Sequence, residues 1–124
     1  MINIAICDDE ELFLQREKEI IYKYMTKKGY NCSIDLFLSG KDYLECDDVE
    51  KYDIVFLDVS MDEMNGIETA KRIRKNNQKV YLIFVTAYIN YATEGYKVNA
   101  SRYVLKNNKT FELAIEESWY SIIQ

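Results

Sequence analysis

The chain contains no histidine and no proline, and only four glycines, among its 124 residues. Without histidine there is no Ser-His-Asp or Cys-His nucleophile system, no histidine general base and no zinc site with a histidine ligand. Any chemistry must therefore use carboxylates, lysine, threonine, tyrosine or a hard metal ion.

Cysteine is also scarce, and no hydrophobic run approaches the ~20 residues that cross a membrane. Cys7, Cys32 and Cys46 form no paired or metal-binding pattern, which predicts reduced thiols and a cytoplasmic protein. Cys7 lies within an apolar run, which favours a small buried side chain over a reactive thiol. The first ten residues pass from a short apolar run to three acids, which is not a signal peptide. We expect no membrane partner.

Basic residues are outnumbered: Lys and Arg total 16, Asp and Glu total 21, and the formal net charge is −5. This acidic balance argues against direct binding to nucleic acid, which requires a basic surface. The length and the 48% of hydrophobic residues suit one domain with its own core. We therefore treat residues 1–124 as a single domain without internal boundary or repeat.

Short apolar runs alternate with helical patterns along the chain. Runs rich in β-branched residues predict buried strands at 2–7, 33–38, 53–57, 80–85 and 102–105. Between them, hydrophobic spacing predicts helices: a long one ending at Gly29, a short one capped by Ser39, one opened by Gly66 and reaching about residue 76, a weak one at 90–97, and a final one from about 111 to 122. Five strand–helix repeats predict a doubly wound, flavodoxin-like α/β fold, with five parallel strands in the order 2-1-3-4-5.

Polar residues follow four of these strands directly. Asp8 and Asp9 follow the first strand, Asp58 the third, Thr86 the fourth and Lys106 the fifth. In such a sheet the functional site lies outside the carboxyl ends of the strands. Clustered carboxylates with open positions suit Mg²⁺, and a carboxylate beside that ion can act as a nucleophile toward phosphorus. The set predicts phosphoryl transfer, with Lys106 and Thr86 contacting phosphoryl oxygens.

Each of these residues also has a simpler interpretation. Asp8 or Asp9 could cap the first helix, and Asp58 could be a loop or turn acid. Thr86 is a common strand residue, and Lys106 could be an ordinary solvated lysine. The specific signal is their joint placement at the ends of four strands.

Five sequence motifs resemble those of the receiver domain of bacterial two-component response regulators. They are Cys-Asp-Asp-Glu after the first strand, Val-Phe-Leu-Asp-Val-Ser-Met at the third, Met64-Asn65-Gly66 before a helix, Val-Thr-Ala after the fourth strand, and Tyr-Val-Leu-Lys at the fifth. The resemblance covers essentially the whole chain and implies the CheY-like form of the predicted fold.

The resemblance implies a role for each site residue. Asp58 would be the phosphoacceptor. Asp9, Asp58 and the main-chain carbonyl of Ser60 would ligate Mg²⁺, with Asp8 acting mainly through a water molecule. Lys106 would pair with the phosphoryl group, Thr86 would move to hydrogen-bond it, and Tyr103 would rotate inward behind Thr86. The phosphodonor would be a sensor histidine kinase, and the domain would be a signalling switch rather than a turnover enzyme.

Two positions depart from the family pattern, because Asp62 and Asn107 stand where the family usually has proline. Neither position is a ligand in this scheme. The stretch from Thr86 to Lys106 resembles receivers that precede a LytTR-type DNA-binding domain. We therefore expect a transcription regulator whose output domain lies outside residues 1–124 and alone contacts DNA. A homodimer through residues 88–124 on phosphorylation is a further expectation.

Three alternatives remain open at this point. A Mg²⁺-dependent phosphohydrolase usually has a second aspartate two residues after the nucleophile, but residue 60 is serine. A flavin- or nucleotide-binding module would have a phosphate-binding loop after the first strand, where this chain has Asp8 and Asp9. A stand-alone or degenerate receiver would act only as a protein-interaction module.

Overall fold

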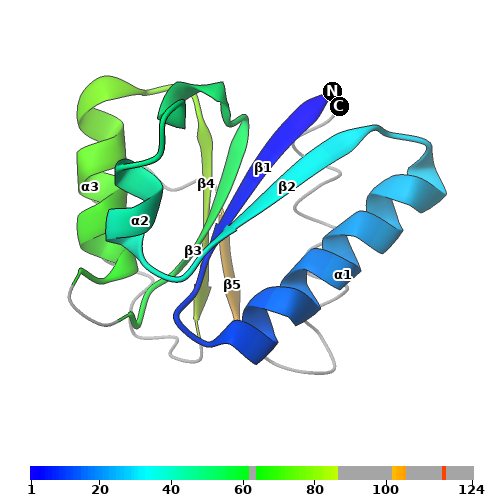
Figure 1. The fold of residues 1–124 in the computed structure, drawn as a ribbon, viewed down its shortest axis with the longest axis horizontal. Helices are drawn as coiled ribbons and strands as arrows, with labels where there is room; N and C mark the ends of the chain where they lie inside the picture. Colours follow the sequence, from blue (N-terminus) through cyan, green and yellow to red (C-terminus); the bar gives the residue numbers. More distant parts are fainter. Residues whose placement is uncertain (62–63, 87–101, 106–115, 117–124) are drawn as a thin grey trace.

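The computed structural model describes residues 1–61, 64–86, 102–105 and 116. In chain order its elements are β1 (Ile2–Cys7), α1 (Glu11–Lys28), β2 (Cys32–Phe37), α2 (Gly40–Leu44), the 3-10 helix η1 (Val49–Lys51), β3 (Ile54–Asp58), α3 (Gly66–Asn76), β4 (Tyr81–Thr86) and β5 (Arg102–Leu105). Figure 1 shows them in sequence colours.

The five strands form one parallel sheet in the order β2-β1-β3-β4-β5. The predicted fold class and strand order are therefore confirmed. The bounds of β1 and β5 agree with the prediction, whereas β2 starts one residue earlier and β3 and β4 one residue later than predicted. The shift of β3 matters most, because it makes Asp58 the last strand residue rather than the first loop residue.

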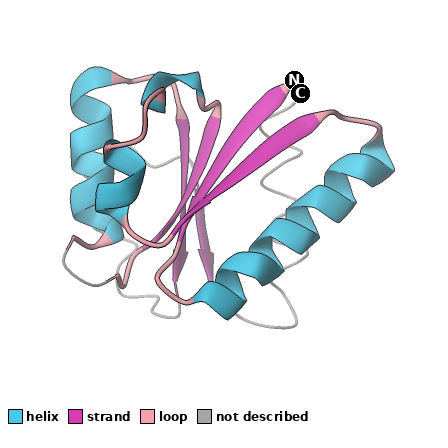
Figure 2. Cartoon of the chain, in the orientation of Figure 1, coloured by secondary structure: helices cyan, strands magenta, loops and turns pink. Residues whose placement is uncertain are grey.

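The sheet is the middle of three layers (Figure 2), with α1 on one face and α2 and α3 on the other. Successive side chains of a strand point to opposite faces. In β1, Ile4 and Ile6 pack on the α1 face, whereas Ala5 and Cys7 pack on the α2–α3 face. Both faces of the central strands are buried, which explains their unbroken apolar sequences.

The helix ends follow the signals in the sequence. Gly29 ends α1 in the left-handed region, with φ 79°, and its N–H donates to the Thr26 carbonyl. The Ser39 side chain accepts a hydrogen bond from Asp42 N–H at the start of α2. The Asn65 side chain accepts one from Glu68 N–H at the start of α3. These three boundaries are as predicted, whereas η1 was not predicted.

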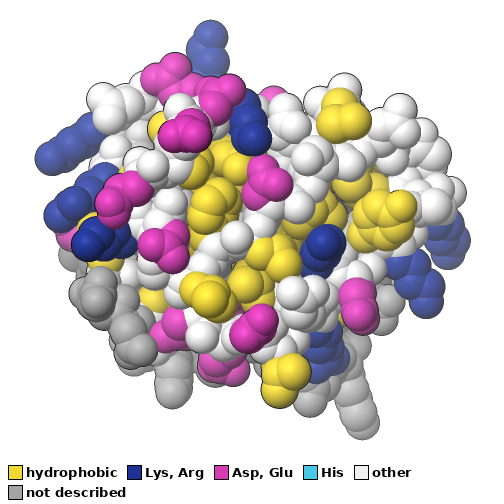
Figure 3. Space-filling view, in the orientation of Figure 1, with side chains coloured by type: hydrophobic (Ala, Val, Ile, Leu, Met, Phe, Trp, Pro, Cys, Tyr) yellow, Lys and Arg dark blue, Asp and Glu magenta, His cyan; other side chains and the backbone are white. Residues whose placement is uncertain are grey.

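Strand β2 is the last strand on its side of the sheet and lies nearest the viewer in Figure 1. All six of its residues are half-buried, whereas all five residues of β3 are buried. In the same orientation, Figure 3 shows hydrophobic side chains in the middle of the view, between α1 and α2.

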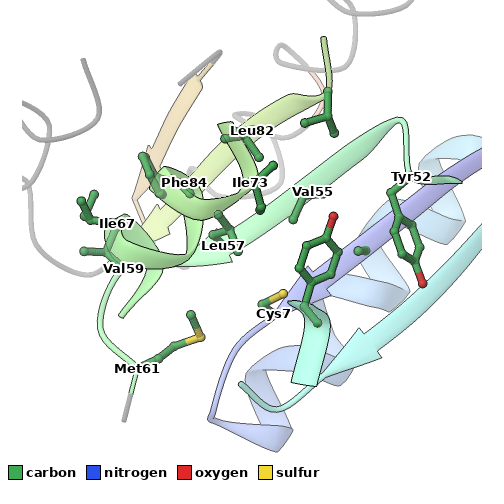
Figure 4. Packing of buried hydrophobic residues seen from close by; sticks show 14 residues of the cluster. Cys7, Tyr52, Val55, Leu57, Val59, Met61, Ile67, Ile73, Leu82 and Phe84 are labelled. Atoms are coloured by element: carbon green, nitrogen blue, oxygen red, sulfur yellow. The ribbon is translucent and has the colours of Figure 1, made fainter. Parts of the chain in front are cut away.

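The core on the α2–α3 face includes two tyrosines beside the aliphatic side chains (Figure 4). Tyr43 and Tyr52 are buried, with ring centroids 5.6 Å apart, and Phe37 meets both rings edge-on. The Tyr52 hydroxyl donates a 2.6 Å hydrogen bond to Asp35 Oδ2, which Lys51 Nζ also approaches at 3.4 Å. Each ring therefore fills the core, while the Tyr52 hydroxyl reaches a partly exposed carboxylate.

Two predicted helices, at 90–97 and 111–122, lie outside the described residues apart from the helical Glu116. Within the part of the chain that the structure describes, no helix is long and apolar enough to span a membrane.

Candidate functional site

Two buried aspartates mark the carboxyl ends of neighbouring strands. Cys7 of β1 pairs with Leu57 of β3, and the next residues along the two strands are Asp8 and Asp58. Neighbouring strands run roughly 4.8 Å apart, so these backbones are adjacent. The side chains of Asp8 and Asp58 are 0% and 3% exposed. The prediction that β1 and β3 bring their acids together at one sheet edge is confirmed.

Backbone amides of the following loops orient both carboxylates. Glu10 N–H donates to Asp8 Oδ1 at 2.9 Å, and Ser60 N–H donates to Asp58 Oδ1 at 3.2 Å. In each case the donating N–H belongs to the residue two positions after the aspartate, so the loop folds back over the carboxylate. Such short local bonds select one direction for a carboxylate side chain.

A third acid joins the cluster at the end of β1. Ligand oxygens of Asp8, Asp9 and Glu10 lie within 4.8 Å of one another, close enough to share one metal ion. Sequence reasoning used Asp8 and Asp9 and missed Glu10, although its place directly after them was the available signal. At the start of α1, Glu10 occupies the N-cap position and makes no side-chain capping bond, and the Asp8 carboxylate accepts the N–H of Glu10 directly before the helix.

Gly66 packs against the backbone of Asp58. A Cβ atom at this position would meet the Asp58 carbonyl oxygen, and it would lie 2.9 Å from the carbonyl carbon and 3.0 Å from Val59 Cα. Gly66 N–H also donates to the Val59 carbonyl at 3.0 Å. The glycine therefore lets the start of α3 approach the end of β3. The sequence indicated Gly66 only as a helix start.

The last residue of β1, Cys7, places a buried thiol directly before the acidic cluster. Cys7 is 1% exposed, and burial, followed by the nearby Glu17, raises the pKa of its thiol well above the usual value. A thiol held protonated reacts poorly. The prediction of a buried Cys7 is confirmed, and none of the three cysteines forms a disulfide.

The remaining predicted residues are placed only in part. Ser60 is exposed, directly beyond β3. Asp58 pairs with Val85, so Thr86, the last residue of β4, follows the position opposite Asp58. Tyr103 belongs to β5, which pairs with β4. Lys106, Asp62 and Asn107 lie outside the described residues.

Two curated proteins are similar to this chain in sequence. The chain is 34% identical over 114 residues to the transcriptional regulatory protein LytR of Staphylococcus aureus strain N315, covering 90% of this chain and 45% of LytR. It is 30% identical over 127 residues to the sensory transduction protein LytT of Oceanobacillus iheyensis, covering 92% of this chain and 46% of LytT. The chain therefore spans less than half the length of these curated relatives.

A solved structure resembles the whole fold. The response regulator protein TrrA from Thermotoga maritima, crystallised in complex with Mg(2+)-BeF, superposes with a TM-score of 0.83 and 28% identity, over 99% of this chain and 100% of that one. The pattern of the response regulator receiver domain matches residues 4–116. With this match over most of its length, and with the two buried aspartates at the expected strand ends, the chain belongs to the response regulator receiver domain family.

Proposed function

We propose that this domain is a phosphorylation-dependent switch of a two-component system in which Asp58 accepts the phosphoryl group. The observation that carries the proposal is the placement of a buried Asp58 beside Asp8 at the carboxyl edge of the sheet. A carboxylate oxygen of Asp58 would form a bond to phosphorus as the P–N bond of a kinase phosphohistidine breaks. The electron pair of that bond returns to the leaving imidazole.

The donor set fits Mg²⁺. Carboxylate oxygens are the ligands this hard ion prefers, and the acids after β1 bring three of them within 4.8 Å. We propose Asp9, Asp58 and the Ser60 carbonyl as direct ligands, with Asp8 acting through water. When bound, the ion would neutralise charge between the acids and the incoming phosphoryl oxygens.

The other side of the phosphoryl group would be met by Lys106 and Thr86. Lys106 would supply a positive charge to one phosphoryl oxygen, and Thr86 a hydroxyl donor to another. Movement of Thr86 would let Tyr103 turn inward and so change the surface of the domain. Val85 of β4 pairs with Asp58, and Thr86 is the next residue along β4; this proximity supports the assignment.

The output would be control of transcription. LytR of S. aureus is named a transcriptional regulatory protein, and this chain covers less than half of it. We propose that a LytTR-type domain outside these residues contacts DNA, that a sensor histidine kinase is the upstream partner, and that phosphorylation drives homodimerisation through residues 88–124. The domain would act in the cytoplasm as a phosphoacceptor that assists its own modification, not as a turnover enzyme.

Intact mass after incubation with acetyl phosphate tests the proposal. The wild-type chain is expected to gain one phosphoryl group only when Mg²⁺ is present, and Asp58→Asn is expected to gain none. Asp53→Asn is a matched control, because Asp53 directly precedes the first residue of β3 and so lies at the other end of that strand from Asp58. The amide oxygen of the new side chain can still accept the hydrogen bond from Asn3 N–H. Absence of phosphorylation in the wild-type chain would reject the proposal in favour of a degenerate receiver acting as a protein-interaction module.

A further inference from the structure

The outer edge of β2 displays a regular row of backbone hydrogen-bonding groups. Ile2 N–H donates to the Asn31 carbonyl and Asp8 N–H donates to the Phe37 carbonyl, so odd-numbered residues of β2 face β1. Backbone groups of a strand alternate between its two sides. The N–H and C=O groups of Cys32, Ile34 and Leu36 therefore point away from the sheet.

This edge has few of the features that usually prevent strand addition. Protein sheets protect their edges with proline, lysine, bulges or very short strands. Strand β2 has the sequence Cys-Ser-Ile-Asp-Leu-Phe, and it pairs with β1 over six consecutive residues without a bulge. Its one charge, Asp35, is engaged by the Tyr52 hydroxyl and by Lys51 Nζ. In the described part of the sheet, no strand lies beyond β2.

Hydrophobic side chains accompany the outward-facing backbone. Cys32, Ile34 and Leu36 are half-buried against the core of the α1 face. Beyond the two ends of the strand, Tyr30 is 41% exposed and Leu38 is 49% exposed. Figure 3 shows hydrophobic side chains, with some charged ones between them, in the middle of the view between α1 and α2, where β2 lies nearest the viewer in Figure 1. An unpaired edge lined by apolar groups is suited to another extended strand.

We propose that a second copy of this chain pairs with this edge, β2 against β2, in antiparallel orientation about a two-fold axis at Ile34. In an antiparallel pair, facing residues that exchange both backbone bonds alternate with residues that exchange none. Centring on Ile34 pairs Ile34 with itself and Cys32 with Leu36 of the second copy. These pairs would form about six hydrogen bonds, at two for each hydrogen-bonded pair.

The side chains favour this register and this occupant. Asp35 faces Ser33 of the second copy, so a hydroxyl donor meets the carboxylate and the two Asp35 side chains are not opposed. Tyr30 falls opposite Leu38 of the second copy, so two exposed hydrophobic residues cover each other at both ends. Moving the axis to Asp35 would instead place the two carboxylates directly opposite each other.

Helix α1 leaves room for this pairing. Helix α1 contacts both β1 and β2, so its axis lies over these two strands. With strands roughly 4.8 Å apart, the two α1 axes would be about 10 Å apart, which is within the range of ordinary helix packing. Half-buried Ile20 and Tyr24 of α1 would add apolar contacts there. This interface is on the opposite edge of the sheet from β5, and it requires no phosphorylation.

Sedimentation of the unphosphorylated chain over a range of concentrations tests the proposal. The wild-type chain is expected to form a dimer, and Leu38→Lys and Tyr30→Lys are each expected to raise its dissociation constant about tenfold or more, the effect of losing roughly one buried apolar contact. Tyr81→Lys is the matched control, because Tyr81 is 39% exposed at the start of β4 and is expected to leave the dimer unchanged.

Cross-linking tests the register. In a Cys32→Ser, Cys46→Ser background, Ile34→Cys is expected to form a disulfide-linked dimer on mild oxidation, because facing Cα atoms of a hydrogen-bonded pair are roughly 5.5 Å apart. Asp35→Cys in the same background is expected to cross-link far less. A wild-type chain that stays monomeric, or a dimer that Leu38→Lys and Tyr30→Lys do not weaken, would overturn the proposal. The monomeric result would leave the edge to a strand of a different protein.

Discussion

Replacing Gly66 with alanine tests how closely α3 is coupled to the phosphoacceptor. The added Cβ would meet the Asp58 carbonyl oxygen and lie 2.9 Å from the carbonyl carbon, whereas ordinary contact starts at 3.4 Å. The neighbours are backbone atoms, so no side-chain rotation relieves the overlap. The end of β3 and the start of α3 must separate by half an ångström or more.

The energetic cost follows from three contributions. Overpacking of this kind costs about 1–3 kcal/mol. Weakening the bond from Gly66 N–H to the Val59 carbonyl adds up to about 1 kcal/mol. The better helix propensity of alanine returns about 1 kcal/mol. We expect Gly66→Ala to lower the free energy of unfolding by about 1–3 kcal/mol, measured by urea titration with circular dichroism.

The same variant is expected to accept phosphate more slowly from acetyl phosphate. Misplacing a reacting group by ~1 Å can cost ~100-fold in rate, so a smaller shift of Asp58 should cost at least about tenfold. Gly29→Ala is the matched control. Its φ of 79° makes alanine costly by about 1–2 kcal/mol, yet no atom of the described residues lies within 4 Å of the added Cβ, and Gly29 is at the far end of α1 from the acids that follow β1.

Gly29→Ala should therefore lose stability and keep the wild-type phosphorylation rate when both proteins are fully folded. An unchanged urea midpoint for Gly66→Ala would refute the steric reasoning. A destabilised Gly66→Ala with the wild-type phosphorylation rate would refute the coupling of α3 to Asp58.

Two further predictions concern the α2–α3 face. In Gly40→Ala the added Cβ would meet the Thr69 hydroxyl and lie 3.0 Å from Thr69 Cβ. We expect the free energy of unfolding, measured by urea titration, to fall by about 1–3 kcal/mol and to be partly restored by Thr69→Ala. Equal losses with and without Thr69→Ala would disprove the contact. Burial raises the pKa of the Tyr43 hydroxyl, and burial followed by the hydrogen bond to Asp35 raises that of Tyr52. Because these tyrosines lose protons first in the unfolded chain, stability should be full below about pH 10 and fall above it, and Tyr52→Phe should flatten this fall; a urea midpoint that is constant between about pH 8 and about pH 11 would contradict it.

The elements with strong periodic signals were predictable because their causes are local. The apolar run of β1, the Ser39 cap and the Gly29 stop each act within a few residues, and the structure places them as expected. The ends of β2, β3 and β4 were each shifted by one residue, since the last residue of a strand is decided by its neighbour. Asp58 counts as a strand residue because Val85 of β4 pairs with it.

The sequence by itself determined the fold class, the strand order and the meeting of Asp8 and Asp58 at one sheet edge, because hydrophobic period and strand order dictate which strand ends lie side by side. Only the tertiary structure decided the contacts between segments distant in sequence. Gly66 against Asp58, Gly40 against Thr69 and the Tyr52 hydroxyl on Asp35 all depend on how closely two elements approach. The same holds for the outward edge of β2, since which of its backbone groups face β1 depends on the pairing register. Local sequence patterns carry no record of such distances, which packing of the whole chain determines.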